Sequence, residues 1–228
     1  MENKNFCAVA IDGPSGAGKS TIARSVAKEL GFVYVDTGAI YRTVGYYAHK
    51  TNTDPKDAPA VIALLPDICI EMKYDAEGLQ RMYCNGEDVT NTIRLPEMSM
   101  YASAVSAIPE VRAFLMDMQR DMAKRSSVIM DGRDIGTVVL PDARVKIFLT
   151  ASAEDRAQRR FEELQRRGTP QAYEQILEEI RQRDYNDSHR AAAPLRAAED
   201  AVLLDTTGNT FEQSRGQILA LIKERMKG

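Results

Sequence analysis

The sequence predicts an α/β protein whose core is a parallel β-sheet flanked by helices, with a smaller region inserted into it. The first observation is that short apolar segments, beginning with residues 6–11, alternate with helical patterns. Continuous apolar segments of this length are typical of parallel strands that are buried on both faces. The second observation is a change of period near residue 68, where apolar and polar residues alternate as in an antiparallel strand. A chain of 228 residues is long enough for one core and one inserted region.

Each element is expected from its apolar period and from the residues that stop it. The first strand covers residues 6–11 and leads into a glycine-rich turn. Residues 18–30 carry Ile22, Val26 and Leu30 at every fourth position, and Gly31 ends this helix. The other expected core elements are strands over residues 32–35, 128–130, 145–149 and 201–204, and helices over residues 40–50, 57–65, 153–167, 173–185 and 211–226.

The inserted region is predicted from residues 67–92. Ile68, Ile70, Met72 and Tyr74 alternate with polar residues, and a turn containing glycine and then Asn85-Gly86 follow. This pattern is typical of antiparallel strands joined by tight turns. We therefore expect a small antiparallel sheet, joined to helices around residues 96–124.

Composition limits the partners that this chain can have. The net charge of −3 and pI near 5.6 give no overall electrostatic attraction for nucleic acid or an anionic membrane. Cys7, Cys69 and Cys84 are odd in number, form no CxxC pair and each lie in a predicted strand, whereas His49 and His189 lack cysteine neighbours at zinc-ligand spacing. The start of the chain has too few apolar residues for a signal peptide, and no segment approaches the roughly 18 apolar residues of a membrane helix. We expect a cytoplasmic protein that binds neither nucleic acid polymers nor membranes.

The strongest motif is the stretch IDGPSGAGKST, which contains the full pattern G-x-x-x-x-G-K-[ST]. Backbone N–H groups of such a loop converge on phosphate oxygens, and the following helix adds the partial positive charge of its N-terminus. Lys19 can reach the β- and γ-phosphates, and the Ser20 hydroxyl can bind Mg²⁺. Because a predicted strand precedes the loop and a predicted helix follows it, we expect a triphosphate site.

The stretch DTGAIYR at residues 36–42 begins where the second strand is expected to end. Ligands bind at this edge of open α/β sheets. Thr37 offers a hydroxyl, Tyr41 a flat wall, and Arg42 a guanidinium group for phosphate. The alternative is that Thr37 or Asp36 caps the following helix while Tyr41 packs beneath it, and both interpretations can hold together.

The stretch VIMDGRDIGT at residues 128–137 places three charged residues after another buried strand. We expect Asp131 to assist the Mg²⁺ shell or the acceptor oxygen, Arg133 to neutralise an acceptor phosphate, and Asp134 to contact a base. The alternative is a turn that an Asp–Arg pair holds in place.

Residues 151–200 contain nine arginines and no lysine. Four of these arginines follow an acidic residue by four positions, as expected for a solvated helix face: Asp155–Arg159, Glu162–Arg166, Glu163–Arg167 and Glu179–Arg183. Arg156, Arg160 and Arg190 have no such pairing. A solvated face would accept lysine equally well, whereas forked phosphate recognition requires arginine. We therefore expect an arginine-rich helical lid.

Four stretches together resemble the bacterial cytidylate kinases, nucleoside monophosphate kinases of the P-loop NTPase superfamily: IDGPSGAGKS, DTGAIYR, DGRDIGTVV-x-PDA-x-x-KIFL and RD-x-x-D-x-x-R-x-x-x-PL, where x marks positions that do not carry the resemblance. The resemblance covers essentially the whole chain. It implies a transferase of pyrimidine nucleotide metabolism that moves the γ-phosphate of ATP directly to CMP or dCMP, with Mg²⁺, giving CDP or dCDP and ADP. It implies a core of about residues 1–36, 125–152 and 195–228, a monophosphate-binding region of about residues 37–124, and a lid of about residues 153–190. We expect a monomer.

The resemblance also implies roles for individual residues. The ATP-binding residues would be Gly13, Pro14, Ser15, Gly16, Ala17, Gly18, Lys19, Ser20, Thr21, Arg156 and Arg159. The CMP-binding residues would be Thr37, Tyr41, Arg42, Arg112, Arg133, Asp134, Arg183, Asp187 and Arg190. The catalytic residues would be Lys19, Asp131, Arg133 and Arg160, and Ser20 would hold Mg²⁺ together with Asp131 through water.

Two other functions stay open at this point. One is the same phosphoryl transfer to another monophosphate such as UMP, and the other is an ATP-binding switch without enzymatic activity. A GTPase is disfavoured because no N-K-x-D base-reading motif follows the loop. An exposed apolar patch would favour the partner-binding switch, and the polar second half of the chain shows no sign of one.

Overall fold

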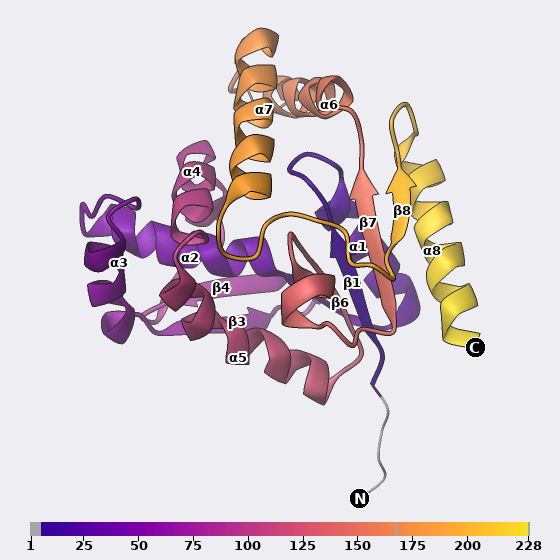
Figure 1. The fold of residues 1–228 in the computed structure, drawn as a ribbon, viewed down its shortest axis with the longest axis horizontal. Helices are drawn as coiled ribbons and strands as arrows, with labels where there is room; N and C mark the ends of the chain where they lie inside the picture. Colours follow the sequence, from indigo (N-terminus) through magenta and orange to yellow (C-terminus); the bar gives the residue numbers. More distant parts are fainter. Residues whose placement is uncertain (1–5, 167, 228) are drawn as a thin grey trace, which may run out of the picture. The chain divides into compact units, whose positions relative to one another are not determined.

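A computed structural model describes residues 6–166 and 168–227 (Figure 1). The described residues form two compact units. The first unit comprises the chain up to Tyr34 and again from Ser126 onward, and the second comprises Val35–Arg125. Each unit is built around its own sheet.

A five-stranded sheet forms the core, in the order β2-β6-β1-β7-β8. The strands are β1 (Ala8–Asp12), β2 (Val33–Asp36), β6 (Val128–Gly132), β7 (Val145–Thr150) and β8 (Val202–Asp205). The pairs β1–β6, β1–β7 and β7–β8 are parallel, with Ala8 opposite Val128 and Val9 opposite Val145. Because strands distant in sequence are neighbours in the sheet, the predicted fold class, a parallel α/β core with a separate small antiparallel sheet, is confirmed.

The helices of the first unit are α1 (Lys19–Leu30), α6 (Ala153–Arg166), α7 (Tyr173–His189) and α8 (Phe211–Lys227). One apolar cluster joins Ile22 and Val26 of α1 with Ile218 and Ile222 of α8 and with the strands. Helix α6 follows the carboxyl end of β7 (Figure 1) and shares a separate apolar cluster with α7. The predicted lid helices therefore have a small core of their own.

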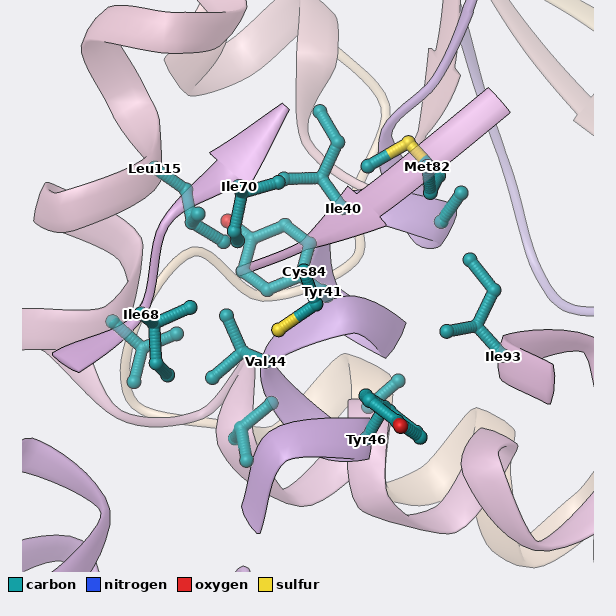
Figure 2. Close-up of a cluster of buried hydrophobic side chains, with 14 of the residues drawn as sticks. Ile40, Tyr41, Val44, Tyr46, Ile68, Ile70, Met82, Cys84, Ile93 and Leu115 are labelled. Carbon is teal, nitrogen blue, oxygen red and sulfur yellow. The ribbon is translucent and has the colours of Figure 1, made fainter. Parts of the chain in front are cut away.

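The second unit surrounds an antiparallel sheet of β3 (Ile70–Tyr74), β4 (Gln80–Cys84) and β5 (Glu87–Asp88). Its helices are α2 (Thr37–Lys50), α3 (Ala58–Leu64), α4 (Pro96–Val105) and α5 (Pro109–Arg125), and single 3₁₀ turns cover Leu65–Asp67 and Thr92–Arg94. Figure 2 shows its core, where Tyr41 and Val44 of α2 lie close to Cys84 of β4. Gly45 allows α2 and α4 to approach, since a β-carbon there would lie 2.9 Å from the Tyr101 β-carbon.

The predicted elements differ from the observed ones mainly at their ends. Helix α2 begins at Thr37 rather than at residue 40, because the Asp36 side chain accepts a hydrogen bond from the Ala39 N–H (2.9 Å) and caps it. The placement of all three cysteines in strands was wrong: Cys84 lies in β4, but Cys7 and Cys69 immediately precede β1 and β3. The predicted last residue of the helix over 153–167 lies outside the described residues.

Gly13 and Gly31 of the first unit should differ strongly in how much stability a substitution by alanine costs. A β-carbon at Gly13 would lie 1.9 Å from the Leu149 carbonyl oxygen, whereas nothing lies within 4 Å of one at Gly31. Both have positive φ, +148° and +68°. We expect Gly31→Ala to lower the free energy of unfolding by about 1–2 kcal/mol, the cost of a left-handed backbone. Gly13→Ala should cost more than about 4 kcal/mol, since it adds a backbone clash.

Urea unfolding of the two variants measures this difference. Equal losses at the two positions would contradict the close approach of Gly13 to β7.

Candidate active site

The loop from Gly13 to Gly18 joins β1 to α1 and curls through three glycines with positive φ: Gly13, Gly16 and Gly18. Gly18 is the N-cap residue of α1 and makes no side-chain cap. The N-terminus of a helix preceded by such a loop carries outward N–H groups and a partial positive charge. This geometry suits a chain of phosphates.

Lys19 is the first residue of α1, and its side chain is almost completely buried. Its Nζ donates a hydrogen bond to the Pro14 carbonyl oxygen (2.7 Å), so the amine lies against the loop. Burial and the nearby charge of Arg133 hold the Lys19 pKa well below its ordinary value, against the opposing effect of Asp131. An anion in the loop would stabilise the charged amine, which favours binding of a phosphate.

Ser20 and Asp131 form a hydrogen-bonded pair of side chains beside Lys19. The Ser20 Oγ donates to Oδ2 of Asp131 (2.8 Å), and the Tyr34 hydroxyl donates to Oδ1 (2.8 Å). Hydroxyl and carboxylate oxygens are ligands that Mg²⁺ prefers. Within residues 6–166 and 168–227, no group of three or more His, Cys, Asp or Glu side chains could hold a metal. The Ser20 and Asp131 oxygens are of the kind that fits Mg²⁺, and they would leave its other positions to phosphate and water.

The charged residues directly after β6 form ion pairs with residues at the end of α7 and directly after it. Arg133 Nε donates to Oδ2 of Asp187 (2.7 Å), and Arg190 Nη2 lies 3.5 Å from Oδ1 of Asp134. Burial alone would raise the pKa of Asp187, but Arg133 and Arg183 outweigh it and hold this pKa below its ordinary value. The structure thus unites four predicted site residues in one ionic cluster, although Arg133 and Asp187 are 54 positions apart in sequence.

The arginines of α6 point in different directions. Arg156 is 4% exposed, donates to both carboxylate oxygens of Asp184 and donates through Nη1 to the Ser15 carbonyl oxygen (2.9 Å). Arg159 pairs with Asp155 and donates to the Thr206 carbonyl oxygen (2.8 Å). Arg156 of α6 therefore connects the phosphate loop to α7.

Two further arginines of α6 and α7 have partners in the same unit. Arg160 pairs with Glu163 on its own helix (2.9 Å), and Arg183 Nη1 of α7 donates to the Ser15 hydroxyl (3.1 Å). Arg156, Arg160 and Arg190, which lack an acid four residues earlier, all have acidic partners at other spacings. Of the expected pairs, Asp155–Arg159 is present, Arg166 Nε donates to the Glu162 backbone, and Arg167 lies outside the described residues.

The second unit carries the other predicted binding residues. Thr37 is buried at the start of α2, and the Arg112 guanidinium lies 5.6 Å from the centre of the Tyr41 ring. Asp36 pairs with Arg94 (2.7 Å). Burial would raise the Asp36 pKa, but Arg94 and Arg42 together hold it below its ordinary value. The positive charges around the start of α2 are thus partly balanced within this unit.

Several residues of these clusters were not predicted from sequence. Asp184 orients Arg156, and Arg94 pairs with Asp36, although neither had an assigned role. Gln80 of β4 accepts from the Asp36 N–H through Oε1 (2.8 Å). Asp12, the last residue of β1, accepts from the N–H groups of Ile135 and Gly136, both at 2.7 Å. Asp12 could have been found from the sequence, because it is a charged residue at the end of a predicted buried strand.

Comparison with known proteins decides the family. The family model described as cytidylate kinase matches residues 9–224. The chain belongs to the cytidylate kinase family. A cytidylate kinase of Caldicellulosiruptor bescii is 51% identical over 219 residues, which cover 96% of each chain. One of Exiguobacterium sp. is 50% identical, covering 97% of this chain and 98% of the relative.

Similarity to solved structures is weaker. A shikimate kinase of Acinetobacter baumannii aligns with a TM-score of 0.47 at 16% identity, covering 97% of this chain and 95% of the other. This level of similarity adds nothing to the topology described above. No helix among residues 6–166 and 168–227 is long and apolar enough to cross a membrane.

Asp12 predicts a pH dependence of stability. Burial raises its pKa to about 6, against the lowering effect of its two backbone hydrogen bonds, from an ordinary value of 3.8. Between these values the native state binds a proton that the unfolded chain has released, so the stability contribution of Asp12 decreases as pH rises. The free energy of unfolding of wild type minus that of Asp12→Asn should decrease by about 3 kcal/mol from pH 3.5 to pH 7.

Denaturant unfolding of both proteins across this pH range measures the difference. Subtracting the variant removes the contributions of carboxyl groups whose pKa values are unchanged. A difference that is constant or rises with pH would contradict a raised Asp12 pKa.

Proposed function

We propose that this protein transfers the γ-phosphate of ATP to CMP or dCMP. The products are ADP together with CDP or dCDP. The observation that carries this proposal is the match to the cytidylate kinase family along residues 9–224, with relatives about half identical over nearly the whole chain. The phosphate loop and its buried lysine support a nucleoside triphosphate as the donor.

On the donor side, residues 13–21 bind the ATP phosphates through backbone N–H groups and Lys19. Ser20 would hold Mg²⁺, with Asp131 acting through water, and the ion would supply positive charge at the phosphate oxygens. Arg156 and Arg159 approach the ATP from α6. The Ser20–Asp131 and Arg156–Ser15 hydrogen bonds support this assignment, since they place these groups beside the loop.

On the acceptor side, the proposed residues bind the CMP phosphate, sugar and base. In the first unit these are Arg133, Asp134, Arg183, Asp187 and Arg190, and in the second they are Thr37, Tyr41, Arg42 and Arg112. The ionic cluster at Arg133 and Asp187 supports the first set. The Tyr41–Arg112 stack and the buried Thr37 support the second.

The reaction is a direct in-line transfer without a covalent enzyme intermediate. A phosphate oxygen of CMP is already a nucleophile, so the protein needs to position the substrates and offset negative charge. Lys19, Arg133 and Arg160 offset charge on the transferring group, and Asp131 orients groups at the metal side. Closure of the helices at residues 153–190 over the substrates excludes water that would hydrolyse ATP.

The wider organisation belongs to the same proposal. Residues 1–36, 125–152 and 195–228 act as the core, and residues 37–124 as the monophosphate-binding region. Cys7, Cys69 and Cys84 are free thiols, which supports a reducing compartment and hence a cytoplasmic enzyme. The active species is a monomer.

An assay of ADP release tests the function. With ATP and Mg²⁺, we expect CMP and dCMP to stimulate ADP release strongly, and UMP, AMP and GMP to stimulate it less. Preference for UMP would retain the mechanism and overturn the assignment of the base. ATP binding without stimulation by any monophosphate would overturn the enzymatic function in favour of an ATP-binding switch.

Lys19→Ala tests the role of the phosphate loop. We expect kcat to fall by about 100-fold or more, since removing one charge that stabilises the transferring group has effects of this size. The unfolding midpoint should not decrease, because the variant removes a buried amine with a lowered pKa. Lys28→Ala, at an exposed position of the same helix, is the control and should keep wild-type kcat.

Turnover of Lys19→Ala within twofold of wild type would overturn the assignment of this loop.

A further inference from the structure

Asp12 lies at the junction between β1 and the phosphate loop, and its carboxylate is almost completely buried. Both oxygens are used: Oδ1 accepts from the Ile135 N–H and Oδ2 from the Gly136 N–H, each at 2.7 Å. These N–H groups begin η3 (Ile135–Val139), a single turn of π-helix. The carboxylate therefore binds the N-terminus of this turn, where backbone N–H groups have no partners within the turn.

The turn directly follows Arg133 and Asp134. The Asp134 carbonyl oxygen accepts from the Val138 and Val139 N–H groups (2.9 and 3.2 Å), so Asp134 is part of the same hydrogen-bonded structure. The side chain of Arg133 reaches Asp187 of α7, and that of Asp134 reaches Arg190, the residue that follows α7. The position of the turn thus determines where the chain presents both side chains.

The turn also packs closely against neighbouring side chains at Gly136. A β-carbon at Gly136 would lie 3.2 Å from Cδ of Lys146 and 3.4 Å from Oδ2 of Asp12. Lys146 itself pairs with the exposed Asp200 (2.8 Å). Gly136 therefore packs closely against both the Asp12 carboxylate and the Lys146 stem, and it leaves little room for a side chain beside the Asp12 hydrogen bond.

We propose that Asp12 is a positioning residue for the acceptor side of the site: it links the base of the phosphate loop to Arg133 and Asp134 without touching a substrate. The inference rests on the proposed function, in which Arg133 and Asp134 bind CMP. Its consequence is that loss of either Asp12 hydrogen bond weakens CMP binding more than ATP binding. A residue with a merely structural role would affect both substrates together.

The replacement of Asp12 by asparagine tests this directly. Asparagine keeps the size of the side chain but offers one oxygen acceptor and an NH₂ group, which cannot accept from the second N–H. In Asp12→Asn we expect KM for CMP to rise about tenfold or more, and KM for ATP to stay within twofold. Asp12→Ala, which loses both acceptors, should raise KM for CMP further.

Two additional variants make the test robust. Asp200→Asn is the control. It changes an exposed carboxylate that pairs with Lys146 and does not accept from the backbone N–H groups of the turn, and it should keep both KM values. Gly136→Ala adds a methyl group beside the Asp12 carboxylate and the Lys146 stem, at a residue without a positive φ, and it should reproduce the selective rise in KM for CMP. If Asp12→Asn does not fold, Gly136→Ala decides the question.

Equal increases in both KM values, or a loss of kcat with KM for CMP unchanged, would overturn the positioning role of Asp12. In that case an active wild type would leave the proposed function intact. A wild-type protein whose ADP release does not respond to CMP or dCMP would overturn both.

Discussion

The close approach of Gly13 to β7 is the constraint on which the rest of the site depends. With the Leu149 carbonyl oxygen 1.9 Å from where a β-carbon would lie, only glycine fits between β1 and β7 at this point. The loop can then curl directly over the carboxyl ends of these strands and lead into the N-terminus of α1. A β-carbon at Gly16 would lie only 3.2 Å from the Arg156 β-carbon, so the same curl brings the loop against α6. The backbone of one loop thus places the helix N-terminus, the buried lysine and Arg156 together.

Carboxylates near the ends of the strands organise the charge around this loop. Asp12 binds two backbone N–H groups, and Asp131 binds two hydroxyl groups. The arginines are likewise held by acids, Arg133 by Asp187 and Arg156 by Asp184. Burying such groups has a large desolvation cost that pairing only partly offsets, so they are weak evidence for stability. The proposed function explains them better, as an arrangement that would hold the proposed phosphate-binding groups in place before a substrate arrives.

Much of the fold and part of the site could be predicted from local sequence. The loop motif, its strand and its helix occupy one continuous stretch, and Asp36 caps α2 three residues away from its partner. By contrast, Asp12 and Gly136 are 124 residues apart, and Arg156 and Asp184 are 28 apart. No local pattern connects such partners. The incorrect placement of Cys7 and Cys69 within strands has a similar origin, since hydrogen bonding to neighbouring strands decides where a strand begins.

The sequence by itself determined the elements whose cause is local: the strands by their apolar content, the helices by their period and caps, and the phosphate loop by its glycines. It also determined which residue types were available for phosphate binding, as the arginines of residues 151–200 illustrate. Only the tertiary structure decided which acid holds which arginine and which carboxylate supports the turn after β6. The physical reason is that a parallel sheet brings together strand ends that are far apart in the chain, and short-range hydrogen bonds form only after that assembly.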